Sequence, residues 1–477
     1  MKLTNKIAVS ASSDVFITVV GFLGTIYFAQ TLGAGPLGTF ALGIAVAQLS
    51  LVLDFGVSQG AIKRISADND PDAHFGAALL VYGIMLVGTV GVILLLGGQI
   101  DSYVGGSFAP VVAVIFAFQR LYQMANVAIK GSNSVHVVDS IDAVERLVRV
   151  CCQAGLVFLG FRALGLFFGY AASYGTAVLL ASLYYARRLS LSIAVPSRRH
   201  FRSLYEFSKY SWIAMFKSRA LSWTDVTVMG FFVANSAVGV YQVSWTLAMT
   251  FQILGISIGR NLFPEVSEEI EAGRTDRVAS LARRSLVFGG LLPIPGIVGA
   301  AIIGKRVLYI YGPEFRAGSA ILVVLAGVSL LRAFEGSINS IANGIDRPRI
   351  TFISNFIFLV ANVVLNVLFV RAYGAIGAAV ATVVSLLLSL SVAYHLVGRH
   401  VEFGLPYGEL GLQLGAAVVM GGLVWALESA LSPLSLVELL LVIGIGASVY
   451  FVLVVTVSGV VRDAVLDVLP QSFRPSV

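Results

Sequence analysis

Fourteen apolar blocks, each about 20 residues long, constrain the fold of this chain more than any other feature of its sequence. A helix rises about 1.5 Å per residue, so about 20 residues cross a hydrocarbon core of roughly 30 Å. We therefore expect an all-α, polytopic membrane protein with about 14 transmembrane helices. The expected spans are about 9–30, 37–61, 76–97, 108–130, 143–161, 164–186, 209–232, 236–259, 284–304, 317–340, 350–371, 375–396, 408–429 and 436–459.

The composition excludes a soluble enzyme. Of the 477 residues, 57% are hydrophobic and only 12% are charged, whereas soluble domains carry roughly 25% charged residues. The connections between the blocks are too short to hold a catalytic domain. No glycine-lysine pair is followed by Ser or Thr, so the sequence has no P-loop for ATP. These features predict a secondary transporter with no cofactor and without ATP hydrolysis.

The distribution of basic residues predicts the orientation in the membrane. With the N-terminus inside, 23 of the 32 Lys and Arg residues fall in inner loops, flanks and tails, five fall in outer loops and four fall within spans. Short cytoplasmic loops carry such an excess of Lys and Arg. We expect both termini to be cytoplasmic, and the net charge of +7 to reflect topology without a nucleic-acid partner.

An internal repeat predicts the domain organisation. The segment GAGPLGTFALGIAVAQLS from Gly33 resembles ANSAVGVYQVSWTLAMTFQ from Ala234, and each would join the first two spans of a bundle. We expect an N-terminal six-helix bundle over 1–190, a cytoplasmic linker over 191–208, a C-terminal six-helix bundle over 209–400, and two additional helices with a tail over 401–477. Duplicated bundles that rock about a central site are typical of alternating-access transporters.

Three stretches within this plan resemble a known family. They are TLGAGPLGTFALGIAVAQLSLVLDFGVSQGAIKRIS (31–66), NLFPEVSEEIEAGRTDRVASLARRS (261–285) and ANGIDRPRITFISNFIFLVANVVLNVLFVRAYGAIGAAVATVVS (342–385). They are similar to the polysaccharide transporter family of oligosaccharide-lipid flippases, which are related to the lipid II flippase and to multidrug and toxic-compound extrusion pumps. The resemblance covers the first twelve spans.

The resemblance implies a substrate, partners and a location. The substrate would be a lipid-linked oligosaccharide on a polyprenyl phosphate or pyrophosphate, moved from the cytoplasmic to the outer face of the cell membrane. The partners would be membrane lipids and glycosyltransferases or a polymerase of the same pathway. The product would serve surface polysaccharide synthesis or protein glycosylation.

Four basic residues lie in the inner half of the predicted spans: Lys217, Arg219, Arg120 and Arg332. A charge at mid-bilayer costs about 2.5 to 3.5 kcal/mol on insertion scales, so such residues usually face a cavity or a partner. Arg and Lys are suited to binding phosphate oxygens in a partly dry cavity. The four cations are therefore candidates for binding the substrate phosphate.

A structural role is the alternative for the same cations. Long basic side chains near a helix end can reach the interface, and Arg332 has Glu335 one turn away as a partner. Asp14 and Asp54, near the cytoplasmic mouth, are candidates for a gate or for proton binding. A purely structural role is the alternative for both residues.

A second polar group lies in the outer half of the spans and includes Asp225, Asn362, Asn366 and Thr382. Asn362 and Asn366 are four residues apart, so they share one helix face and offer amide oxygens of the kind a hard monovalent cation prefers. The resemblance to the lipid II flippase implies a sodium site at these four residues and the carbonyl of Ala378. Asn366 replaces a carboxylate of that flippase. The alternative is an interhelical amide cluster that only holds helices together.

Two other functions stay open at this point. One is a cation-coupled exporter of small amphipathic drugs, whose cavity would favour acidic and aromatic residues over four inner cations. The other is a non-transporting membrane subunit of a glycan-assembly complex, for which several ionisable groups within spans would be costly.

Overall fold

The computed structural model describes residues 20–51, 56–67, 70–431 and 435–468, and these residues form helices and no strand. Within this part of the chain, nine helices are long and apolar enough to cross a membrane, and Val20–Leu32 and Ala34–Ser50 are shorter apolar helices. The expected all-α membrane fold is confirmed. The contacts divide the chain into two compact units, Met1–Gly239 (unit 1) and Val240–Val477 (unit 2). The four-part domain division stays a prediction.

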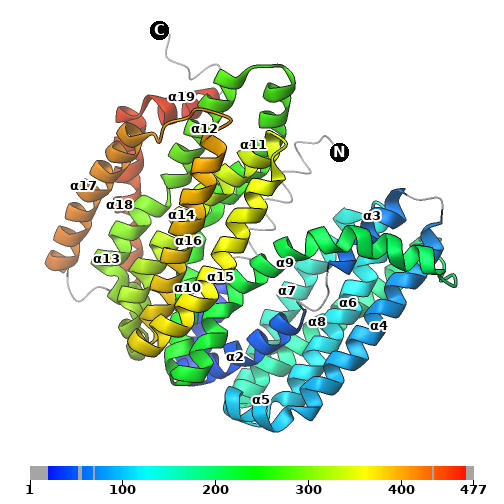
Figure 1. Cartoon of the computed structure of the whole chain (residues 1–477). Coiled ribbons are helices and arrows are strands. Elements are labelled where there is room, and N and C mark those ends of the chain that lie inside the picture. The colour runs from blue at the N-terminus through cyan, green and yellow to red at the C-terminus, as the bar shows by residue number, and fades with distance from the viewer. Residues whose placement is uncertain (1–19, 52–55, 68–69, 432–434, 469–477) are drawn as a thin grey trace. The chain divides into compact units, whose positions relative to one another are not determined.

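Unit 1 follows the predicted spans closely (Figure 1). After Val20–Leu32, its helices are α2 (Ala34–Ser50), α3 (Val57–Ala67), α4 (Pro71–Leu95), α5 (Gly97–Val104), α6 (Ala109–Gly131), α7 (Val135–Phe158), α8 (Arg162–Arg188) and α9 (Arg198–Phe232). The predicted block 37–61 is divided between α2 and α3, and the short α5 was not predicted.

Unit 2 contains the remaining helices (Figure 1). They are α10 (Asn235–Met249, which begins in the last residues of unit 1), η2 (Thr250–Gln252), α11 (Ile253–Glu271), α12 (Thr275–Gly290), α13 (Pro293–Tyr309), η3 (Pro313–Gly318), α14 (Ser319–Gly344), α15 (Pro348–Tyr373), α16 (Ala375–Gly398), α17 (Tyr407–Leu431), α18 (Leu436–Val457) and α19 (Gly459–Val468). The predicted block 284–304 is interrupted where α13 begins at Pro293, because proline has no N–H to continue the preceding helix.

The predicted linker over 191–208 is extended only in its first part. Asp72 of α4 accepts hydrogen bonds from the backbone N–H and the hydroxyl of Ser192, at 2.9 and 2.6 Å. Asp70 pairs with Arg199 at 3.2 Å. From Arg198 the chain is already helical, as the first turn of α9. These contacts hold the linker against the start of α4.

The repeat noticed in the sequence brings two glycines together. Gly38 in α2 and Gly239 in α10 occupy the same position of the repeat. A Cβ on Gly38 would overlap the carbonyl oxygen of Asn235, and a Cβ on Gly239 would overlap that of Ala34. Only glycine allows the two backbones to approach this closely.

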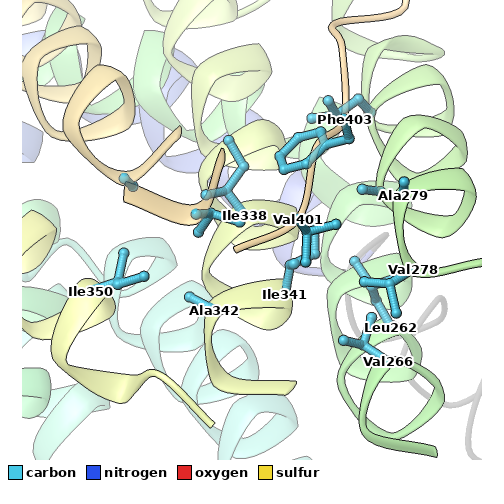
Figure 2. Packing of buried hydrophobic residues seen from close by; sticks show 14 residues of the cluster. Leu262, Val266, Val278, Ala279, Ile338, Ile341, Ala342, Ile350, Val401 and Phe403 are labelled. Atoms are coloured by element: carbon cyan, nitrogen blue, oxygen red, sulfur yellow. The ribbon is translucent and has the colours of Figure 1, made fainter. Parts of the chain in front are cut away.

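A buried apolar cluster fixes one end of unit 2. Figure 2 shows residues from α11, α12, α14 and α15 together with Val401 and Phe403 from the segment after α16. The turn between α11 and α12 is made by Gly273, at φ 72°, followed by Arg274, whose guanidinium donates to Glu269. This hydrogen bond holds the pKa of the Glu269 carboxyl below its usual range.

Candidate functional site

The outer amide cluster is built on the hairpin of α15 and α16. Gly374 ends α15, and a Cβ on Gly377 would overlap the carbonyl oxygen of Phe369, so the two helices meet backbone to backbone at the turn. This close approach lets Asn362 reach the neighbouring helix, where its Nδ2 donates to the Thr382 hydroxyl at 3.1 Å. Asn366 donates from its own Nδ2 to the carbonyl of Asn362 at 2.9 Å.

The cluster offers uncharged oxygen ligands. Asn362, Asn366, Thr382 and Ala378 are each fully buried. Among the described residues, no hydrogen-bond partner contacts the Oδ1 of Asn362. An amide oxygen buried in this way has lost its water without replacing it, which is costly unless another ligand is bound. The donor set therefore fits a small hard cation.

Asp225 lies in α9 of unit 1, where its side chain is 2% exposed. Within the part of the chain that the structure describes, no group of three or more His, Cys, Asp or Glu residues is arranged to hold a metal. The part of Asp225 in an ion site stays a prediction.

The inner cations occupy different surroundings. The side chain of Lys217 lies outside the described residues, as do Asp14 and Asp54. Arg219 of α9 donates through Nη1 to the Oε1 of Gln48 in α2. Arg219 is half-buried, so its guanidinium is neither sealed in the core nor fully in solvent.

Arg120 of α6 is fully buried. Its guanidinium carbon lies 5.4 Å from the ring centres of both Tyr82 and Phe116, and its Nη1 donates to Gln123 at 3.3 Å. A cation over aromatic rings is stabilised by their negative faces. In this conformation Arg120 is enclosed within unit 1, so substrate contact would require a rearrangement.

Arg332 of α14 donates through Nη1 to the Sδ of Met249 at 3.2 Å. Its predicted partner Glu335 is 6% exposed and accepts a hydrogen bond from Ser389 of α16 at 3.5 Å. Through this hydrogen bond, the Glu335 side chain of α14 contacts α16. The phosphate-binding role of the inner cations stays a prediction.

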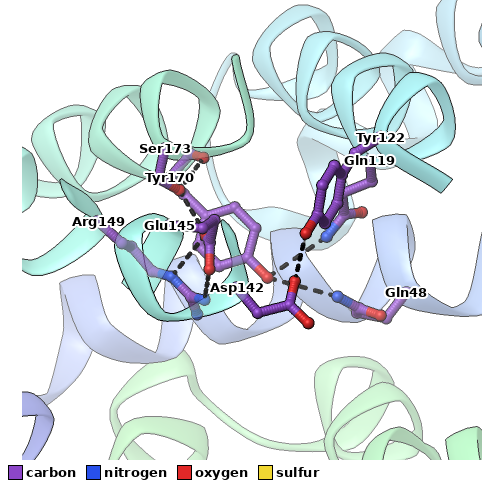
Figure 3. Close-up of polar contacts among 8 residues, drawn as sticks. All are labelled: Gln48, Gln119, Tyr122, Asp142, Glu145, Arg149, Tyr170 and Ser173. Carbon is purple, nitrogen blue, oxygen red and sulfur yellow. Dashed lines mark hydrogen bonds and ion pairs between the residues drawn. The ribbon is translucent and has the colours of Figure 1, made fainter. Parts of the chain in front are cut away.

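A polar network connects four helices of unit 1, and it was not expected from the sequence. Figure 3 shows it between α2, α6, α7 and α8. The Tyr170 hydroxyl accepts from Gln48 and from Gln119, both at 3.4 Å. The Tyr122 hydroxyl donates to Asp142 at 2.6 Å.

An ion pair in α7 forms the other half of this network (Figure 3). Arg149 donates through Nε to Glu145 at 3.1 Å, and its guanidinium lies 4.8 Å from the centre of the Tyr170 ring. Glu145 is 4% exposed and also accepts from the Ser173 hydroxyl at 2.6 Å. The sequence signal for this pair is the spacing of four between Glu145 and Arg149 near the start of the apolar block 143–161.

Comparisons with known proteins agree with this architecture. The family model described as polysaccharide biosynthesis protein matches residues 3–269, and the MatE model matches residues 212–368. AglR of Haloferax volcanii, described as a probable flippase, is 28% identical over 99% of both chains. Agl15 of the same organism, described as a probable low-salt glycan biosynthesis flippase, is 27% identical over 92% of both chains.

A solved structure shares the fold over almost the whole chain. The lipid II flippase MurJ in an inward closed conformation matches with a TM-score of 0.80 and 14% identity, over 96% of this chain and 100% of that chain. The resemblance to oligosaccharide-lipid flippases expected from the sequence is confirmed. Since the first family model spans more than half of its residues, the chain belongs to the polysaccharide biosynthesis protein family.

Proposed function

We propose that the protein is a flippase that moves a lipid-linked oligosaccharide from the cytoplasmic to the outer face of the cell membrane. The observation that carries the proposal is the similarity to AglR and Agl15 along nearly the full length of the chain, combined with the MurJ fold. On this proposal the protein is a transporter and not an enzyme. Membrane lipids and enzymes of the same glycan pathway are its partners.

The inner cations give this proposal a chemical basis. A polyprenyl phosphate or pyrophosphate presents phosphate oxygens, and a guanidinium binds such oxygens with charge-assisted hydrogen bonds. Arg219 is half-buried, and its Nη1 donates to the amide of Gln48, whereas Arg120 is fully buried. We propose a phosphate-binding role also for Lys217, which lies two residues away in the same helix.

Reconstitution tests the proposal directly. Purified protein in liposomes should move a fluorescent lipid-linked oligosaccharide between leaflets, and Arg219→Ala should weaken substrate affinity roughly tenfold to a hundredfold, the usual value of a lost charge-assisted contact. Lys217→Arg should be tolerated better than Lys217→Ala. Normal flipping by a well-expressed Lys217→Ala, Arg219→Ala double variant would contradict the phosphate-binding role.

We also propose that gradients drive the cycle. A headgroup with two negative charges that moves outward, in a cell with a negative interior, gains about 2.3 kcal/mol per charge per 100 mV. Sodium bound by Asn362, Asn366 and Thr382 would bias which side of the empty transporter is open, provided that sodium binds one conformation better than the other. Flipping in sealed vesicles without ATP, at a rate that follows the imposed potential, is the expected result.

A cation-coupled drug exporter is the second candidate, and the match of the MatE model to residues 212–368 favours it. A drug exporter would be expected to lower the accumulation of cationic dyes. Cells that express this chain should show no such change if it handles anionic lipids. Accumulation of a lipid-linked glycan on the inner leaflet after deletion of the gene would support the flippase function over drug export.

A further inference from the structure

A pocket of about 580 Å³ lies within unit 1, between the short helix α5 and the last turn of α9. Both helices are labelled in Figure 1. A volume of this size falls in the usual range of small-molecule sites, about 300 to 1,000 Å³. The orientation predicted from the basic residues places the connection that contains α5 on the outer side of the membrane. The α5–α9 pocket is lined by Gly98, Gln99, Ser102, Tyr103, Gly230 and Phe231.

The lining of the α5–α9 pocket carries no charge. The acidic residue of α5, Asp101, is not among the lining residues. Its carboxylate instead begins α6, where it accepts hydrogen bonds from the backbone N–H groups of Phe108 and Ala109, both at 2.7 Å. A phosphate is bound best by cations, so this pocket does not suit a phosphate group. A neutral lining fits a neutral part of a ligand.

Two aromatic rings form the apolar part of the pocket. The ring centres of Tyr103 and Phe231 are 4.8 Å apart. Phe231 is 70% exposed, so much of its ring is open to a ligand. The face of an aromatic ring is negative, and it attracts the slightly positive C–H groups on one face of a sugar ring. The pair thus offers a surface on which a sugar ring can pack.

The position of this aromatic pair is fixed by its surroundings. The Tyr103 hydroxyl donates to the carbonyl of Thr227 in α9 at 2.8 Å. A Cβ on Gly230 would lie 2.5 Å from the Tyr103 ring, so glycine allows the ring to rest on the backbone of α9. Asn235 donates to the carbonyl of Val104 at 2.8 Å and holds the end of α5. The pocket is therefore formed before a ligand arrives, which reduces the entropy lost on binding.

Two polar side chains of α5 complete the pocket. Gln99 and Ser102 are three residues apart, so they lie on the same face of the helix. Both side chains are exposed. An amide and a hydroxyl can each donate and accept hydrogen bonds, as the hydroxyls of a sugar can. Aromatic rings beside such groups match a saccharide better than they match a lipid chain, which makes no hydrogen bonds.

We propose that the α5–α9 pocket binds a sugar residue of the lipid-linked oligosaccharide on the outer side of the membrane. The inference rests on the proposed function, because that function supplies the glycan. Tyr103 and Phe231 pack against the sugar ring, and Gln99 and Ser102 bind its hydroxyls. The competing occupant is a polyprenyl chain, which would use the rings alone.

The experiment compares two lipids on the full chain, in a detergent without a sugar headgroup, by native mass spectrometry. The probe is dolichyl pyrophosphate that carries two N-acetylglucosamine residues, and bare dolichyl pyrophosphate is the control. Phe231→Leu keeps an apolar side chain but removes the aromatic face. It should raise the Kd for the glycosylated lipid roughly three- to tenfold, the usual contribution of an aromatic contact, without changing the Kd for the bare lipid.

Two further substitutions at the end of α9 sharpen this comparison. Phe231→Trp keeps an aromatic face and should preserve the Kd for the glycosylated lipid. Phe232→Leu is the matched control, since Phe232 is also exposed but does not line the pocket. It should change neither Kd.

Gly98→Leu tests the pocket without removing any contact. A Cβ on Gly98 meets nothing within 4 Å, so the new side chain can fill the pocket without a clash at its base. Leucine is also a better helix former than glycine, so the melting temperature should not fall. The Kd should rise for the glycosylated lipid only. Gly88→Leu, where a Cβ on α4 also meets nothing within 4 Å, should change neither Kd.

The outcomes separate the inference from the proposed function. If wild-type protein flips the glycosylated lipid in liposomes, but Phe231→Leu and Gly98→Leu leave its Kd unchanged, the sugar site alone is overturned. An equal rise in Kd for both lipids would identify a polyprenyl chain as the occupant and would also overturn the sugar site. Wild-type protein that neither binds nor flips either lipid would contradict the proposed function, and the sugar site with it.

Discussion

At the scale of single residues, the ion pair between Glu145 and Arg149 places a buried carboxylate inside unit 1. Glu145 is 4% exposed, and the side chain of Arg149 is 28% exposed. A buried carboxylate needs a cation and hydrogen bonds to offset its lost hydration. Arg149 and the Ser173 hydroxyl supply both.

Arg149→Met should therefore destabilise the protein. The variant leaves Glu145 without its cation, and the loss of a hydrogen bond to a charged group costs about 1.5 to 3 kcal/mol. The melting temperature in detergent should fall clearly. Arg146→Met, on an exposed side chain of the same helix, should change stability by less than about 0.5 kcal/mol. Equal melting temperatures for the two variants would show that the Glu145–Arg149 ion pair contributes nothing to stability.

The amide cluster of α15 and α16 gives a second residue-scale prediction. Asn366→Asp should increase the stabilisation of the protein by sodium, measured as the difference in melting temperature between sodium chloride and choline chloride. A carboxylate beside the free oxygen of Asn362 strengthens a cation site. Asn355→Asp, at a buried position of the same helix, should show no sodium response.

The absence of a sodium response in Asn366→Asp would mean that the amide cluster of α15 and α16 only holds these helices together. A carboxylate buried without a cation is strongly unfavourable. Asn366→Asp would then lower the melting temperature equally in sodium chloride and in choline chloride. The amide pair could be read from the sequence by its spacing of four, but the contact of Asn362 with Thr382 required the close approach at Gly377.

At the scale of helices, the contact between α2 and the start of α10 depends on two glycines. The side chain of Asn235 strengthens this contact, because its Nδ2 donates to the Thr39 hydroxyl and to the Val104 carbonyl, both at 2.8 Å. The sequence repeat predicted that the two segments are equivalent. The repeat could not predict that the two segments touch, because similar sequences show that two segments are equivalent and not how far apart they lie.

Gly38→Ala should lower the yield of folded protein, because the added Cβ would overlap the Asn235 carbonyl and force the helices apart. Overpacking of this kind typically costs about 1 to 3 kcal/mol. Gly35→Ala is the matched control in the same helix, since a Cβ there meets nothing within 4 Å. Size-exclusion profiles and melting temperatures that do not distinguish the two variants would contradict the close contact.

At the scale of the whole molecule, the order of spans was predictable because each apolar block is as long as a membrane is thick. The predicted spans lie within five residues of α4, α6, α8 and α14 to α18, whereas α7 begins eight residues before its predicted span. Short helices and interruptions within a span were less predictable. The helices α5 and α19 are too short to form apolar blocks, and α13 begins at a proline inside the apolar block 284–304. The polar network of unit 1 escaped prediction because its partners come from four separate helices.

The orientation of the chain gives the prediction at this scale. In a variant without Cys151 and Cys152, a cysteine introduced by Ile193→Cys should react with an impermeant reagent only from the cytoplasmic side. Phe161→Cys should react only from the outside. Both positions are exposed, at 68% and 47%, and basic residues dominate the loop that contains Ile193. Labelling of both from one side would refute the proposed topology.

The pairing of Glu145 with Arg149 also bears on how the chain enters the membrane during synthesis. The two residues are one turn apart on α7, so their charges can neutralise each other as soon as that helix forms. Arg219 instead donates to Gln48 on α2, which lies far away along the chain. We therefore expect the Glu145–Arg149 pair to lower the cost of inserting α7 into the membrane before any other helix packs against it.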